Sequence, residues 1–161
     1  MKNLILIRHA KSSWNTPVQD FDRLLEQRGR EDAYLVANYF VKFLPSNFVI
    51  HSSSARRARE TAVIFATTVL YPVESIVLRD NLYTFDANQL ERVIKSISND
   101  FDKVILFGHN DAITNFVDKF GDIFIDNVPT AGLVWLEFET DSWAGIAKCK
   151  TIKTIFPRNL K

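Results

Sequence analysis

The chain has 161 residues, of which 47% are hydrophobic and 24% are charged, as is typical of globular proteins. This length allows one ordinary core, so we expect a single domain over residues 1–161. The 20 lysines and arginines are nearly balanced by 19 aspartates and glutamates, which argues against binding to nucleic acid or to an anionic membrane surface.

Cysteine content and apolar segments predict where the protein resides. The single cysteine, Cys149, cannot form an intrachain disulfide, which fits a reducing compartment. The apolar run at residues 4–7 is too short for the core of a signal peptide. The run at residues 63–73 is too short to span a bilayer. We therefore expect a cytoplasmic protein without a membrane anchor.

Apolar runs and helical spacing alternate along the first 120 residues. Four short runs are continuously apolar, which is typical of strands buried on both faces of a parallel sheet. These runs are residues 4–7, 48–50, 76–78 and 104–107. Apolar residues with helical spacing occur in segments 33–43, 58–69, 90–97 and 113–120. Asp86 with Gln89 predicts the start of the third helix, and Gly121 predicts the end of the fourth.

The C-terminal segment has a different pattern. Residues 133–139 and 146–155 alternate apolar with polar side chains around a turn at residues 141–143, which predicts an antiparallel hairpin. Together the elements predict a three-layer α/β/α sandwich, with a mostly parallel sheet and the hairpin at its edge. Ligands bind beyond the carboxyl ends of the strands in such sheets.

Polar residues follow three of the predicted strands at this edge. Arg8 and His9 come after the first run, the segment 51–61 with Arg57 follows the second, and His109 follows the fourth. Phosphoryl transfer needs positioning and stabilisation of negative charge. The planar forks of Arg8 and Arg57 suit phosphate oxygens and could replace a metal ion.

Either histidine could attack phosphorus, because a neutral imidazole is a competent nucleophile near neutral pH. We assign this role to His9, which directly follows a strand beside Arg8. His109 would then donate a hydrogen bond to a phosphoryl oxygen, preferably as an imidazolium. The spacing alone does not distinguish the two histidines.

Three motifs resemble those of the histidine phosphatase superfamily, also called phosphoglycerate-mutase-like. They are the Arg8-His9 pair, the Ser-x-x-x-Arg-Ala-x-x-Thr pattern of residues 53–61, and the Gly-His-Asn turn of residues 108–110. Residues 8–14, 20–29 and 129–132 are further similar to the short SixA-type phosphohistidine phosphatases within that superfamily.

The resemblance implies a set of site residues. His9 would be the phosphorylated nucleophile, and Arg8, Arg57 and His109 would complete the phosphate pocket without a metal or another cofactor. Residues implied to bind substrate are Asn15, Arg23, Asp22 and Asn110.

The resemblance also bears on the substrate. Larger relatives carry an acid that protonates the leaving oxygen, and the candidates here are Asp80 and Asp86, of which Asp86 is more simply explained as a helix cap. Without an acid, an imidazole leaving group is favoured over an alkoxide. We therefore expect hydrolysis of phosphohistidine in a partner protein, such as a phosphotransfer domain or phosphocarrier in signal transduction. Alternatives are a phosphatase of small phosphate esters or sugar phosphates, and a non-catalytic module that recognises phosphate.

Overall fold

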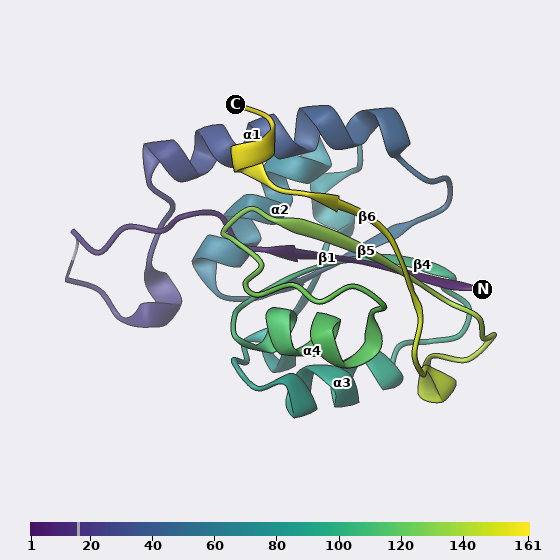
Figure 1. Cartoon of the computed structure of the whole chain (residues 1–161). Helices are drawn as coiled ribbons and strands as arrows, with labels where there is room; N and C mark the ends of the chain where they lie inside the picture. Colours follow the sequence, from purple (N-terminus) through teal and green to yellow (C-terminus); the bar gives the residue numbers. More distant parts are fainter. Residues whose placement is uncertain (16) are drawn as a thin grey trace.

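In the computed structural model, which describes residues 1–15 and 17–161, one six-stranded sheet lies between two layers of helices (Figure 1). The strands are β1 (Lys2–Arg8), β2 (Val49–Ser53), β3 (Val77–Arg79), β4 (Lys103–Gly108), β5 (Leu133–Phe138) and β6 (Lys150–Ile155). The helices are α1 (Gln27–Phe40), α2 (Arg56–Thr68), α3 (Ala87–Lys95) and α4 (Ala112–Phe120). The strand order is β3-β2-β4-β1-β5-β6, in which β5 runs antiparallel to β1, and β6 runs antiparallel to β5. The predicted α/β/α sandwich is therefore confirmed.

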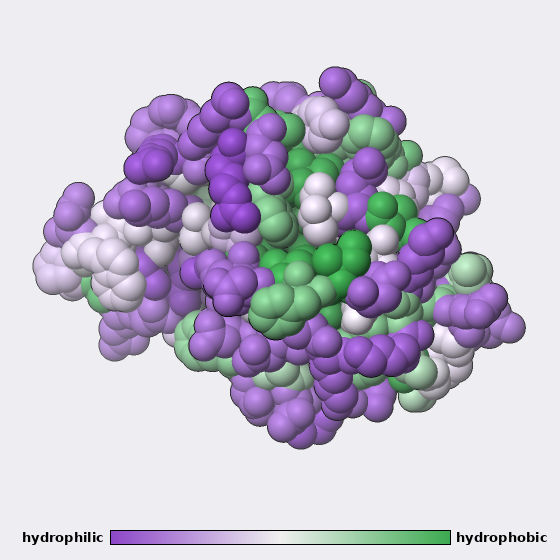
Figure 2. Space-filling view, in the orientation of Figure 1, coloured by the Kyte–Doolittle hydropathy of each residue, from purple (hydrophilic) through white to green (hydrophobic). Residues whose placement is uncertain are grey.

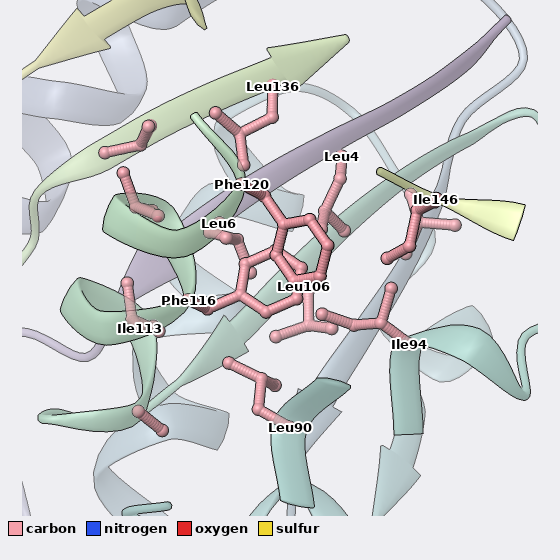
Figure 3. Packing of buried hydrophobic residues seen from close by; sticks show 14 of the residues in the cluster. Leu4, Leu6, Leu90, Ile94, Leu106, Ile113, Phe116, Phe120, Leu136 and Ile146 are labelled. Carbon is pink, nitrogen blue, oxygen red and sulfur yellow. The ribbon is translucent and has the colours of Figure 1, made fainter. Parts of the chain in front are cut away.

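Alternation along the central strands builds two cores. Leu4 and Leu6 of β1 face the cluster under α3 and α4, whereas Ile5 and Ile7 face the cluster under α1 and α2. All four side chains are fully buried, because successive side chains of a strand point to opposite faces and both faces are covered. Figure 3 shows the first cluster, where Phe116 of α4 lies among side chains of β1, β4 and α3.

Two strands differ from their predicted form. β3 lies at the edge of the sheet and pairs only with β2, so Val77 and Leu78 are about half exposed instead of buried. β2 continues beyond residue 50 to Ser53, because it pairs with β4 through Ser52 and with β3 through Ser53. The backbone polar groups of this stretch are thus satisfied by two neighbouring strands.

The C-terminal hairpin forms at the predicted edge, but its connection contributes to the core. Trp143, which we placed in the turn, is fully buried. Its indole Nε1 donates a hydrogen bond to the carbonyl of Phe101 at 2.8 Å, and its backbone N–H donates to Asn99. The aromatic ring extends the core under α3, because its polar nitrogen finds a partner inside.

The surface is mostly hydrophilic on the face that Figure 1 shows, with an apolar area near its centre (Figure 2). The loop after α4 exposes Ile123 and Phe124 and lines a cavity of about 560 Å³ together with Phe156 and Arg158. This cavity contains no histidine. No helix in residues 1–15 and 17–161 is long and apolar enough to cross a membrane.

Candidate active site

A cleft of about 270 Å³ opens at the carboxyl ends of β1 and β4. It is lined by Arg8, His9, Lys11, Ser12, Trp14, Asp20, Arg23, Arg57, Phe85, Asn110 and Thr130. These residues come from separate parts of the chain, and the parallel strands bring their loops to one edge of the sheet. The convergence predicted from the sequence therefore occurs, and the charged side chains that line the cleft are mainly basic.

Both ring nitrogens of His9 make hydrogen bonds, one with a backbone carbonyl and the other with an arginine. Its Nδ1 lies 2.7 Å from the carbonyl oxygen of Ala10, so this nitrogen carries the proton and donates. Its Nε2 therefore has the lone pair and accepts a hydrogen bond from Nε of Arg57 at 3.4 Å. Burial, and then the charges of Arg57, Arg8 and Arg23, lower the pKa of His9 to about 3. The ring is thus neutral and nucleophilic at physiological pH.

Backbone contacts fix the position of His9 at the end of β1. The N–H of Ala131 donates to the carbonyls of Arg8 and His9 at 3.0 and 3.1 Å. Ala131 adopts a left-handed conformation with φ of 61° in order to make this turn. On the other side, the N–H of Ala10 donates to the hydroxyl of Thr61 in α2. The segments 129–132 and 53–61, singled out from the sequence, therefore hold the backbone around His9.

Three arginines, together with the exposed Lys11, supply the positive charge of the cleft. Arg57 is only 1% exposed although it carries a full charge, and it rises from the first turn of α2. Arg8 uses Nη1 to donate to the carbonyl of Val128, and burial lowers its pKa. Arg23 lies under Trp14, whose ring is 3.6 Å from the guanidinium carbon. Such guanidinium groups are suited to phosphoryl oxygens.

His109 lies beside His9, with their ring centroids 5.3 Å apart. Its Nε2 is 2.8 Å from the hydroxyl of Ser53. Burial, followed by the neighbouring His9 and Arg57, lowers the pKa of His109 to about 2. This lowered pKa disfavours the expected imidazolium in the free protein, chiefly because burial penalises the charged ring and also because cationic arginines lie nearby.

Two buried nitrogen atoms at the site have no hydrogen-bond partner among the described residues. They are Nε of Arg8 and Nδ1 of His109. Buried polar atoms in folded proteins are nearly always paired. An oxygen of a bound anion could pair with the Arg8 nitrogen, so the cleft retains capacity for a phosphoryl group.

Asp20 is a site residue that sequence reasoning missed in favour of Asp22. The carboxylate of Asp20 lines the cleft and bonds to both Arg57 and Arg23 at 3.0 Å. The phenol of Tyr83 donates to the same carboxylate. Partial burial alone would raise the pKa of Asp20, but hydrogen bonds from Tyr83, Arg23 and Arg57 lower it to about 2. The spacing of Asp20 and Arg23, three residues apart, is a signal that could have indicated this pair.

The remaining candidates are distributed unevenly around the cleft. Arg23 and Asn110 line it, but Asn110 also accepts hydrogen bonds from the backbone and hydroxyl of Thr114 in α4. Asn15 and Asp22 are exposed and lie outside the lining, because the loop after β1 and the short 3-10 helix Asp20–Asp22 turn them outward.

The two possible proton donors also lie elsewhere. Asp80 accepts a hydrogen bond from Ser54, and Asp86 caps α3 by accepting from the N–H of Asn88. Asp86 is thus the predicted helix cap, whereas Gln89 bonds to Arg92 and does not complete the cap pair. Neither carboxyl lines the cleft. Within residues 1–15 and 17–161, no cluster of three or more histidine, cysteine or acidic side chains could hold a metal ion.

Comparison with solved structures shows which proteins share this fold. The structure of the protein histidine phosphatase SixA complexed with tungstate superposes with a TM-score of 0.82 at 17% identity, covering 99% of each chain. A mycobacterial glucosyl-3-phosphoglycerate phosphatase complexed with VO3 gives a TM-score of 0.72 at 16% identity, over 95% of this chain and 98% of that one. These similarities establish the α/β architecture.

Sequence comparison gives the family. An uncharacterized chloroplastic protein of Arabidopsis thaliana is 33% identical over 120 residues, which are 68% of this chain and 54% of that protein. The chain thus spans about half the length of this relative. The model of the histidine phosphatase superfamily (branch 1) matches residues 4–93, which include Arg8, His9 and Arg57. The chain belongs to the histidine phosphatase superfamily.

Proposed function

We propose that this protein is a metal-independent phosphatase that removes the phosphoryl group from phosphohistidine in a partner protein. The observation that carries the proposal is the state of His9. Its Nδ1 is held by the Ala10 carbonyl, and its Nε2 lone pair, which accepts a hydrogen bond from Nε of Arg57 at 3.4 Å, lies at a cleft lined by Arg8, Arg23 and Arg57. A phosphoryl group placed among these arginines would present its phosphorus to a neutral nucleophile.

The reaction would take two displacements. In the first, the Nε2 lone pair of His9 forms a bond to phosphorus while the P–N bond of the substrate breaks. The electron pair of that bond goes to the leaving imidazole, which takes a proton from solvent. In the second, water attacks phosphorus, the bond to His9 breaks, and phosphate leaves. Arg8 and Arg57 would stabilise the phosphoryl charge in both steps.

The charge of Asp20 supports an imidazole as the leaving group. Asp20 is the carboxyl among the described residues that line the cleft. With a pKa of about 2 it is ionised at neutral pH and has no proton to donate. An alkoxide leaving group requires such a proton, whereas an imidazole nitrogen can be protonated by solvent near neutral pH. The cleft is therefore better suited to phosphohistidine than to a phosphate ester.

The surroundings of the cleft fit a phosphoryl group carried by a protein. Trp14 and Phe85 line it and are 76% and 52% exposed. Exposed aromatic side chains are frequent at protein interfaces. A phosphotransfer domain or a phosphocarrier that acts in signal transduction would be a partner of the right chemistry. The cytoplasmic location expected from the sequence belongs to this same proposal.

The decisive experiment measures phosphate release in the presence of a chelator. The substrates are a histidine-containing phosphotransfer domain phosphorylated with phosphoramidate and, separately, glycerol 3-phosphate, an alkyl ester whose alkoxide leaving group requires a proton. We expect release from the phosphohistidine protein, little release from the ester, and no release with His9→Ala. Brief incubation followed by alkaline quenching should trap an acid-labile phosphate on His9, seen by mass spectrometry.

Three results would contradict parts of the proposal. Release from the ester alone would show a phosphatase of small esters or sugar phosphates. Binding of both substrates without release would show a phosphate-recognition module. Full activity of His9→Ala would refute the assignment of the nucleophile. Lys148→Ala, a substitution outside the residues that line the cleft, serves as the matched control.

A further inference from the structure

The carboxylate of Asp20 occupies the arginines that a phosphoryl group would need. Its Oδ2 accepts from Nη2 of Arg57 at 3.0 Å, and its Oδ1 accepts from Nε and Nη2 of Arg23 at 3.2 and 3.0 Å. Its backbone carbonyl accepts from Nη1 of Arg57 at 2.7 Å. A carboxylate and a phosphoryl group both present anionic oxygens that accept hydrogen bonds from guanidinium N–H groups. The two anions therefore compete for the same donors.

The carboxylate is held firmly but is not part of the core. Its side chain is 40% exposed, compared with 2% for the side chain of Arg57. It belongs to a single turn of 3-10 helix, Asp20–Asp22, in which none of the residues is buried. The phenol of Tyr83 is a further donor to Oδ2. Asp20 can consequently move away from the arginines without opening the core. This movement breaks its hydrogen bonds with Arg57, Arg23 and Tyr83.

We propose that Asp20 is a specificity-determining residue, whose carboxylate competes with phosphoryl oxygens for Arg57 and Arg23. This inference rests on the proposed phosphatase function of the same cleft. Because Asp20 occupies these donors, an anion must overcome the cost of displacing its carboxylate in order to bind. Inorganic phosphate and small phosphate esters offer little beyond the phosphoryl group itself to overcome it. A phosphoryl group carried by a protein adds the contacts of a whole interface.

Two consequences follow from this competition. The product phosphate is bound weakly, because the carboxylate returns to the arginines as the anion leaves. Small phosphate esters are likewise bound weakly, because of electrostatic competition and not because of steric exclusion. Removing the charge of Asp20 should therefore tighten the binding of every small oxyanion.

The test uses Asp20→Asn, which keeps the size of the side chain and removes its charge. The dissociation constant of tungstate, measured by titration calorimetry, should fall about tenfold, as expected for loss of one nearby like charge in a partly exposed site. The value of kcat/KM for p-nitrophenyl phosphate should rise about tenfold. Asp100→Asn is the matched control, because Asp100 is exposed in the turn before β4, at the opposite end of that strand.

Other outcomes would overturn the inference. Weaker tungstate binding in Asp20→Asn would mean that the carboxylate merely holds Arg57 in place. Unchanged tungstate binding with a reduced kcat would mean that it acts as a base in the reaction. If Asp20→Asn does not fold, Tyr83→Phe provides a second variant, because it removes only the phenol donor. It should tighten tungstate binding about threefold, and unchanged or weaker binding would again refute the competition.

The wild-type protein separates this inference from the proposed function. If the wild type hydrolyses neither substrate but Asp20→Asn still binds tungstate more tightly, the proposed function fails and the competition by Asp20 stands. If the wild type is active and Asp20→Asn binds tungstate no more tightly, the phosphatase stands and the role of Asp20 fails.

Discussion

Gly29 lies where helix α1 touches the loop that carries the nucleophile, and Gly29→Ala tests this contact. A Cβ at position 29 would lie 2.2 Å from the carbonyl oxygen of Lys11 and 2.9 Å from its nitrogen. Lys11 also accepts a hydrogen bond from the N–H of Glu26 at 2.9 Å. The added Cβ would therefore meet backbone atoms of Lys11, which cannot rotate away as a side chain could.

The expected cost follows from two opposing terms. Alanine in place of a helical glycine ordinarily stabilises by up to about 1 kcal/mol. Overpacking a buried site ordinarily costs about 1–3 kcal/mol, and relief here needs a backbone displacement of roughly 1 Å to restore an ordinary contact. We expect the clash to exceed the helix gain, with a net loss of about 2 kcal/mol in the free energy of unfolding.

Urea unfolding followed by circular dichroism measures this loss. Gly145→Ala is the control, because its nearest neighbour would be the hydroxyl of Thr140 at 3.3 Å, a side chain that can adjust. The control should change stability by less than about 0.5 kcal/mol. At temperatures where Gly29→Ala is still folded, kcat should fall about tenfold, because Lys11 follows the Ala10 carbonyl that orients His9. A Gly29→Ala variant that is more stable than wild type would refute the reasoning.

Three further predictions concern charge, protonation and capping. Arg57→Lys loses the planar fork that contacts His9 and Asp20, so kcat/KM for the phosphohistidine protein should fall about 100-fold, measured by phosphate release. Burial lowers the pKa of His51 to about 4; the unfolded chain therefore binds more protons, and stability is lost as pH falls below about 6.5. Its share should reach about 2 kcal/mol by pH 5, and urea unfolding of His51→Gln should show a correspondingly smaller loss between pH 7 and pH 5. Asp86→Ala removes the cap of α3 and should cost about 1 kcal/mol in urea unfolding without lowering kcat; a large fall in kcat would restore Asp86 as a proton donor.

The layers of the fold were predictable because burial imposes a period on the sequence. The continuous apolar runs became β1 and β4, which are covered on both faces, and the helical spacing of residues 113–120 became α4. The same rule failed for β3, since an apolar triplet does not reveal whether a helix covers it. It also failed for Trp143, because the partners of its nitrogen are Asn99 and Phe101, more than 40 residues away.

The candidate site was predictable where position on a strand determines direction. Arg8 and His9 follow β1 immediately, and His109 follows β4, so the parallel sheet brings them together. Asp20 and Asp22 differ in this respect, because both lie in a turn whose direction depends on contacts made later in the chain. Asp20 faces inward because Tyr83, 63 residues away, donates to it. Sequence spacing contains no information about that contact.

The protonation states of His9 and His109 depend on their burial, which residue type alone does not reveal. The expected role of His109 as donor to a phosphoryl oxygen suggested an imidazolium, but both histidines are buried and have lowered pKa values. The positive charge of the cleft therefore resides on arginines, which remain charged when buried. This distribution of charge between neutral histidines and charged arginines suits the proposed chemistry. A neutral His9 keeps the lone pair it needs for attack, the arginines stabilise the phosphoryl charge, and Asp20 limits how tightly a small anion can exploit them.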